Sequence, residues 1–86
     1  MFTLLGAQID TEVRTATGRV DAVMKLPDAI YVFEFKYNKS AEEALAQIDE
    51  RGYLVPFEHD GRRLFKVGVN FSEKTQTVED WIVREG

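Results

Sequence analysis

The run of residues that most constrains the fold is AIYVFEFKY, which extends from Ala29 to Tyr37. It is rich in β-branched and aromatic residues, which favour strands. Its apolar residues fall on both faces of the expected strand, a pattern typical of a central strand that is covered on each side. The run also contains Glu34 and Lys36. Because burying an unpaired charge costs several kcal/mol, these two side chains need partners or a function.

Tight turns connect this run to two earlier strands. Segments 8–15 and 19–26 have the residue pattern of strands, and the intervening TATG sequence, residues 15–18, is a turn signal. Pro27-Asp28 is a second turn signal, because proline presets the backbone angle of the first central position. The first three strands therefore form two consecutive hairpins.

A helix is expected after the third strand. Ser40 is a good N-cap with Glu43 at the capping-box position, and Gly52 is a typical C-terminal stop. The apolar residues between them recur at helical spacing and form one stripe, Ala41, Ala44, Leu45 and Ile48.

The remaining segments complete a mixed sheet. Residues 56–62 form a loop, and 63–71 and 77–85 form a fourth and a fifth strand. The order β-β-β-α-β-β predicts an α/β fold, with the helix as a right-handed crossover between parallel third and fourth strands. With 86 residues, the chain forms a single domain, 1–86.

The second turn determines which residues of its two strands lie opposite each other. If residues 27–28 are its centre, Asp21 lies opposite Glu34 and Arg19 opposite Lys36. The opposite face then carries the expected core, Val20, Ala22, Met24, Tyr31, Phe33 and Phe35. Phe71 and Trp81 are also expected in the core.

Carboxylates that lie opposite each other repel, which raises a pKa or requires a cation. With Ala16 and Thr17 at the centre of the first turn, Glu12 also lies opposite Asp21 and becomes a further candidate ligand. Carboxylate oxygens are what Mg²⁺ prefers, and Lys36 is suited to a phosphate oxygen or a water. This pattern favours metal-assisted hydrolysis of a phosphodiester. A cross-strand lattice of salt bridges on a solvated face is the alternative that the spacing leaves open.

Composition restricts the class of protein. The chain has no cysteine, which fits a reducing, cytoplasmic setting, and no apolar run long enough to span a bilayer. Its net charge of −4 argues against a simple basic patch for nucleic acid, although a metal could still bridge an acidic site to phosphate.

The chain resembles the PD-(D/E)XK nuclease superfamily over EVRTATGRVDAVMKLPDAIYVFEFKYNKSAEEALAQIDERGY and the later KVGVNFS and VEDWIV. More narrowly, it is similar to the nuclease-like domain that follows AAA-ATPase-like domains in bacterial proteins of unassigned function. The resemblance implies a restriction-endonuclease-like core, Mg²⁺ or Mn²⁺ as cofactor, and hydrolysis of DNA.

The resemblance also implies a role for individual residues. Asp21 and Glu34 resemble the two metal-binding carboxylates, and Phe35 stands where the family offers a backbone carbonyl to the metal. Lys36 resembles the lysine that positions water or stabilises developing charge. Gln47 resembles a glutamine on the following helix that supports the site.

The superfamily core normally begins with a helix that covers the sheet, but only MFTLLGAQ precedes the first strand here. We therefore expect either a fragment of a longer protein, with the ATPase-like domain upstream, or a homodimer in which a second copy supplies the cover. A non-catalytic module of the same fold, used for assembly or partner binding, is the alternative function.

Overall fold

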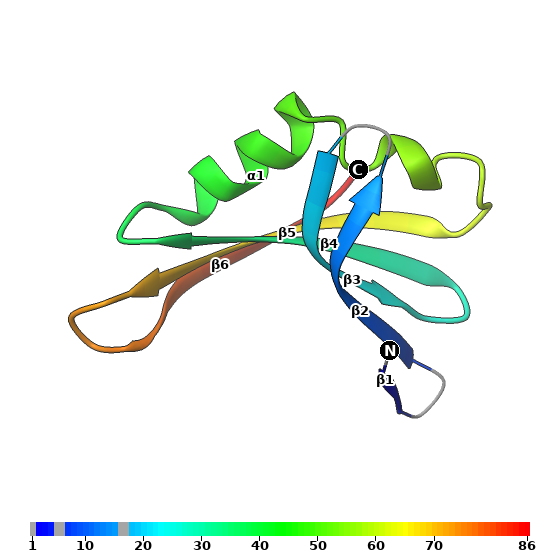
Figure 1. Ribbon diagram of the computed structural model, residues 1–86. Coiled ribbons are helices and arrows are strands. Elements are labelled where there is room, and N and C mark those ends of the chain that lie inside the picture. The colour runs from blue at the N-terminus through cyan, green and yellow to red at the C-terminus, as the bar shows by residue number, and fades with distance from the viewer. Residues whose placement is uncertain (1, 5–6, 16–17) are drawn as a thin grey trace.

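A computed structural model describes residues 2–4, 7–15 and 18–86, which form one mixed sheet with a helix packed on it (Figure 1). The elements are β1 (Phe2–Leu4), β2 (Ala7–Thr15), β3 (Gly18–Lys25), β4 (Ala29–Tyr37), α1 (Ala41–Glu50), the 3-10 helix η1 (Val55–Phe57), β5 (Arg63–Ser72) and β6 (Thr77–Glu85). The described strands follow the order β1-β2-β3-β4-β5-β6 across the sheet. Among the described strands, only β4 and β5 are parallel, with α1 in the connection between them.

The predicted fold class is therefore confirmed, with two additional elements. Phe2–Leu4 pairs with the start of β2, in a segment where no strand was predicted. A ladder of three residues is too short to show the alternation that reveals a strand in a sequence. Within the predicted loop 56–62, Pro56 lies in the first turn of η1, and Phe57 is buried. No helix in the described part of the chain is long and apolar enough to cross a membrane.

The tight turns set the register as predicted. The Leu26 N–H donates to the Ala29 carbonyl over 2.8 Å, which closes a turn with residues 27–28 at its centre. Ala22 consequently pairs with Phe33, in the predicted register. In the first hairpin Thr15 pairs with Gly18, and the expected central residues 16–17 lie outside the described part.

Both predicted ends of α1 are confirmed. Ser40 Oγ accepts a hydrogen bond from the Glu43 N–H at 3.1 Å. At the other end Gly52 adopts a positive φ of 61°, its N–H donates to the Asp49 carbonyl, and the next N–H donates to the Ile48 carbonyl. These two bonds satisfy carbonyls that the last helical turn leaves without partners.

The core lies on the side of the sheet that carries α1 and η1 (Figure 1). Its buried members are Val20, Val23, Ile30, Val32, Leu45, Ile48, Tyr53 and Phe57. The helix approaches β5 closely at Gly68, where an added Cβ would lie 2.4 Å from the Ala41 carbonyl oxygen. Glycine is therefore required where β5 passes beneath the helix.

The prediction of which face forms the core was wrong. Met24, Tyr31, Phe33 and Phe35 are half-buried on the side without a helix, whereas Ile30 and Val32 are fully buried under α1. Ala22 is buried on the side without a helix, where it lines a hollow beside Met24 and Phe33. Because β4 is apolar on both faces, its alternation did not determine which face the helix covers.

Two departures from the predicted core have local reasons. Val20 is buried in the core as predicted, but so is Val23, although strict alternation would place them on opposite faces. The strand pair is irregular between these residues, at Asp21. Trp81 is 66% exposed, because it lies on the edge strand β6, on the side of the sheet without a helix.

Replacing Gly68 with Ala is expected to lower the free energy of unfolding by about 1–3 kcal/mol. The added methyl would overlap the backbone of Ala41 and press on Ala44 and Leu45. Urea unfolding would measure the change. Ala46→Ser, on the exposed side of α1, serves as a control that should change stability by less than about 0.5 kcal/mol. Equal stability of the Gly68 variant and the wild type would contradict the close packing.

Candidate functional site

The candidate site lies where β3 separates from β4. The ladder between these strands ends at the pair Ala22 and Phe33, one position before Asp21 and Glu34. The register of the predicted pair is therefore right, but Asp21 and Glu34 do not continue the ladder, and Arg19 does not pair with Lys36. Two carboxyl groups are brought together at this opening in the sheet.

Asp21 is held by the backbone of β4. Its Oδ2 accepts a hydrogen bond from the Phe35 N–H over 2.9 Å, in place of the ladder that has just ended. In an extended strand the N–H and C=O of one residue point to the same side, so the Phe35 carbonyl also faces toward Asp21. One carboxylate and one backbone carbonyl are thus directed to the same opening.

Glu34 is the most unusual polar residue of the site, because it is only 5% exposed. Its Oε2 accepts a hydrogen bond of 2.7 Å from Gln47 Nε2. Its other oxygen, Oε1, is buried and accepts no hydrogen bond from a donor among the described residues. A buried carboxylate oxygen without a partner is costly and fits a site completed by a cation.

Gln47 bridges Glu34 and Lys36, the two charged residues of β4. Its amide nitrogen donates to Glu34, and its amide oxygen accepts from Lys36 Nζ. The side chain extends from α1, and Glu34 itself pairs with Gly68, the residue that lets the helix approach. The amide group suits this position because it offers a donor and an acceptor at once.

Burial raises the pKa of the Glu34 carboxyl from 4.5 to about 7, and repulsion from Asp21 adds to the effect. The positive charges of Lys36 and Arg51 act in the opposite direction. At neutral pH Glu34 is therefore protonated in one fraction of the molecules and ionised in the rest. A cation that binds here competes with this proton.

Arg51 contributes to the electrostatics of the site, and the sequence analysis did not identify this residue. Its charge favours the ionised form of Glu34. The available signal was its spacing from Gln47, because residues four apart lie on the same face of a helix. Arg51 itself is the C-cap of α1.

The predicted cross-strand pair of Glu12 and Asp21 is not formed. The ladder of β2 and β3 includes Thr11 with Ala22 and Val13 with Val20, but it omits the pair between them. Glu12 adopts a φ of 51°, which is uncommon for a residue other than glycine, and its side chain is exposed. The flanking pairs keep the predicted register, so the left-handed backbone of Glu12 interrupts the ladder opposite Asp21 without shifting it.

The described side chains do not form the salt-bridge lattice that the sequence left open as an alternative. Lys36 donates to the Gln47 amide, and neither Asp21 nor Glu34 takes part in an ion pair with a described residue. Glu34 is also buried, whereas such a lattice belongs on a solvated face.

The donors available for a metal are two carboxylates and a backbone carbonyl. Across residues 2–4, 7–15 and 18–86, no group of three or more Asp, Glu, His or Cys side chains could hold a metal ion. The orphaned Glu34 Oε1 nevertheless fits a hard cation, and Mg²⁺ commonly keeps several waters when it binds through one or two carboxylates. The donor set of Asp21, Glu34 and the Phe35 carbonyl is consistent with this manner of binding.

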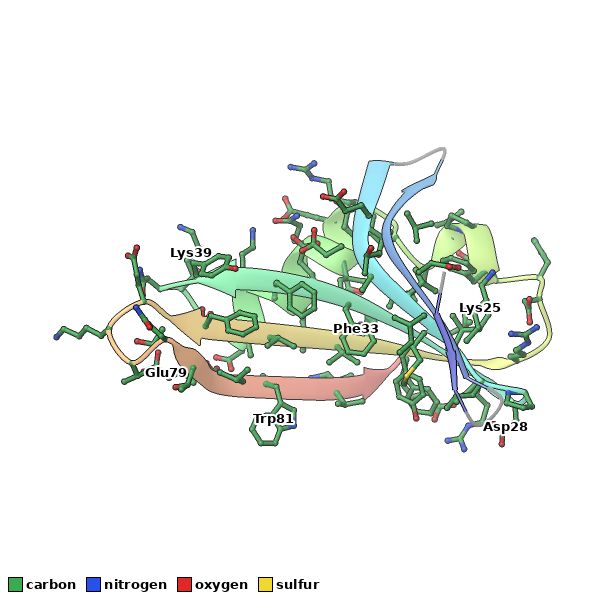
Figure 2. The ribbon with its side chains drawn as sticks, turned by 60° about the horizontal axis from the view of Figure 1, so that its bottom comes forward. Lys25, Asp28, Phe33, Lys39, Glu79 and Trp81 are labelled. Carbon is green, nitrogen blue, oxygen red and sulfur yellow. The ribbon has the colours of Figure 1, made fainter. Side chains whose placement is uncertain are left out.

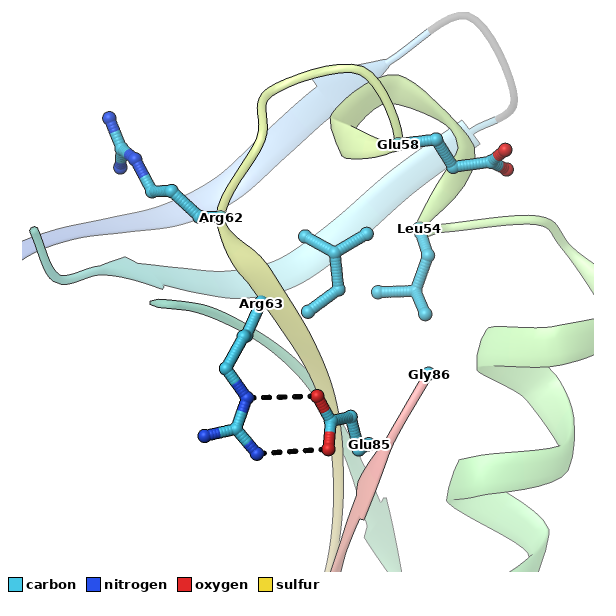
Figure 3. Close-up of a pocket in the computed structure, with 7 residues that line it drawn as sticks. Leu54, Glu58, Arg62, Arg63, Glu85 and Gly86 are labelled. Carbon is cyan, nitrogen blue, oxygen red and sulfur yellow. Dashed lines mark hydrogen bonds and ion pairs between the residues drawn. The ribbon is translucent and has the colours of Figure 1, made fainter. Parts of the chain in front are cut away.

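A hollow of about 490 Å³ lies beside the start of β5 and the end of β6 (Figure 3). Three of its four charged side chains, those of Arg62, Arg63 and Glu85, already have partners. Arg63 binds both oxygens of Glu85 at 2.9 and 3.0 Å, and Arg62 pairs with Asp60. We assign no function to this hollow.

Comparison with known proteins identifies the family. The family model of the PD-(D/E)XK nuclease superfamily matches residues 1–81, so the chain belongs to this superfamily. A protein described as "Uncharacterized protein in vnfD 5'region" from Azotobacter chroococcum mcd 1 is 31% identical over 84 residues. The match covers 95% of this chain but 16% of that relative. No solved structure matches the chain.

Replacing Glu34 with Gln is expected to stabilise the metal-free protein by about 1–3 kcal/mol at about pH 8, because the buried wild-type carboxylate is ionised there. The folded pKa is raised, so wild-type stability relative to the variant is highest below pH 4.5 and falls as pH rises through about 7. Urea unfolding at a series of pH values would measure this difference.

Glu79→Gln provides the control, since Glu79 is exposed on β6. We expect it to change stability by less than about 0.5 kcal/mol at every pH. If the Glu34 variant were less stable than the wild type at about pH 8, the ionised carboxylate would not destabilise the folded protein, which would contradict the prediction.

Proposed function

We propose that this domain hydrolyses phosphodiester bonds in DNA with the help of Mg²⁺ or Mn²⁺. The observation that carries the proposal is the buried Glu34, whose Oε1 has no hydrogen-bond donor among the described residues, next to the anchored Asp21 and a lysine held by Gln47. Membership of the nuclease superfamily supports the same activity.

In this proposal Asp21, Glu34 and the Phe35 carbonyl hold the metal. When bound, the ion would polarise a phosphoryl oxygen and lower the pKa of a bound water. Hydrolysis adds the oxygen of water to phosphorus and breaks one P–O bond, which leaves a phosphate monoester and a hydroxyl group.

Lys36 acts on the charge that develops during this reaction. Its ammonium group has three N–H donors, one of which is directed to Gln47. The other two are available for a phosphate oxygen or for the attacking water. Gln47 is a positioning residue, because it fixes Lys36 and Glu34 relative to each other without touching the reacting atoms.

The resemblance to nuclease-like domains that follow AAA-ATPase-like domains extends the proposal. We place the domain in a longer cytoplasmic protein with such an ATPase-like domain upstream. A second candidate function is a non-catalytic module for assembly, which is favoured by the apolar face of the sheet that no described helix covers. The two functions differ in their need for a metal ion. Hydrolysis requires the ion, and an assembly module does not.

Calorimetric titration with Mn²⁺ tests the metal site. We expect the wild type and Asp28→Asn, a variant in the exposed turn, to bind Mn²⁺ equally, and Asp21→Asn to lose binding by at least about tenfold. At a concentration about 100 times its dissociation constant, the ion should stabilise the wild type by about 2.7 kcal/mol. Equal binding by Asp21→Asn would contradict the assignment.

Nicking of plasmid DNA tests the reaction. Activity should require Mg²⁺ or Mn²⁺ and should fall by about 100-fold or more in Lys36→Ala, because developing charge loses its partner. Lys39→Ala is the matched control, since Lys39 is an exposed lysine just after β4, in the connection to α1. Activity that survives chelation or the loss of Lys36 would refute the mechanism. Metal binding without any nicking would favour the assembly module.

A further inference from the structure

The side of the sheet opposite α1 and η1 carries a continuous apolar surface, which we call the open face. It consists of Ile9, Met24, Tyr31, Phe33, Phe35, Tyr37, Phe65, Phe71, Trp81 and Val83. Figure 2 turns this side forward, with Phe33 over the middle of the sheet and Trp81 projecting from β6. No described helix lies on this side (Figure 1).

The aromatic rings of the open face support one another. Tyr31 stacks on Phe65 with ring centroids 4.7 Å apart, and Phe71 contacts both Phe35 at 5.9 Å and Tyr37 at 5.5 Å. Rings packed in this way lose little further freedom when a partner covers them. The face is therefore a preformed surface.

The exposed area is large for a chain of this size. Trp81 is 66% exposed, Tyr37 67% and Val83 49%. The accessible surface of the chain is 5729 Å², whereas a compact monomer of this mass exposes about 5,200 Å². With the half-buried rings, the open face presents on the order of 600 Å² of apolar side chain, against about 800 Å² per partner in a standard interface.

The open face contains both a projecting side chain and a hollow that could receive it. Trp81 extends from β6, and β2, β3 and β4 form a shallow apolar hollow of about 280 Å³. The hollow is lined by Ile9, Thr11, Ala22, Met24, Phe33 and Phe35. In a two-fold interface, a residue that contacts a site on the partner is contacted in the same way by the partner's copy.

We propose that a second copy of this chain covers the open face, with the two sheets packed face to face and each Trp81 inserted into the hollow of the other copy. Two charged residues at the border, Arg63 and Glu85, do not oppose this arrangement, because they are already paired with each other. A highly charged partner would find no complementary charged group among the described residues in the middle of the face. Sheets packed in this way are a common arrangement in proteins, and buried aromatic anchors provide much of the binding energy at interfaces.

Sedimentation velocity and fluorescence test the proposal on the same samples. From about 1 to about 100 µM the wild type should convert from monomer to dimer, a range typical of weak interfaces of this size. Trp81 is the only tryptophan of the chain, so its emission reports directly on the interface. The emission should shift to shorter wavelength over the same concentration range, as the indole leaves water.

Val83 and Val55 provide a matched pair of substitutions. They are 49% and 52% exposed, and Val83 lies on the open face whereas Val55 lies on η1. Val83→Glu should raise the dissociation constant of the dimer at least about tenfold, and Val55→Glu should change it less than about twofold. Circular dichroism confirms folding, and Trp81→Ser replaces Val83→Glu if the latter unfolds.

Three results would overturn the proposal. One is a monomer throughout the concentration range. Another is a dimer whose tryptophan emission does not change, or one that the open-face variants leave intact, because the interface would then lie elsewhere. The third is growth beyond a dimer, since a closed two-fold contact ends at two copies.

Discussion

The double contact of the Gln47 amide is the interaction on which the site depends. One helical side chain holds the buried Glu34 through its nitrogen and Lys36 through its oxygen. This contact requires α1 to sit close to the sheet, and Gly68 permits that approach directly beside Glu34. The caps of the helix fix its ends and therefore the height at which Gln47 emerges. Local sequence signals in this way determine the geometry of a site made from three elements.

The site also depends on an interruption of the sheet. Where β3 separates from β4, Asp21 accepts the Phe35 N–H, and its carboxylate takes the place of a backbone partner. The left-handed conformation of Glu12 on the neighbouring strand belongs to the same irregularity. Strained residues and broken ladders are common at functional sites, because they direct polar groups into positions that a regular sheet would use for pairing.

Much of this arrangement could be predicted from the sequence, because it follows from local chemistry. The turn at residues 27–28 fixed the register that brings Asp21 beside Glu34, and the cap at Ser40 fixed the start of the helix. The assignment of the core face failed, since β4 is apolar on both faces and only the position of α1 distinguishes them. The pairing of Glu12 failed because a left-handed residue within a strand has no sequence signal unless it is glycine. The exposure of Trp81 could not be predicted, because hydrophobicity does not reveal which strand lies at the sheet edge.

The central claim is that Glu34 is a buried carboxyl held beside Asp21, with one oxygen left for a cation. Titration of the Glu34 side-chain carbon by nuclear magnetic resonance, in the metal-free protein, measures this directly. We predict a midpoint at about 7, above the ordinary value of 4.5, which moves to lower pH when Mg²⁺ is added. Asp21→Asn should lower the midpoint in the metal-free protein, because the repulsion is removed. A midpoint near 4.5 that responds neither to Mg²⁺ nor to the loss of Asp21 would contradict the account.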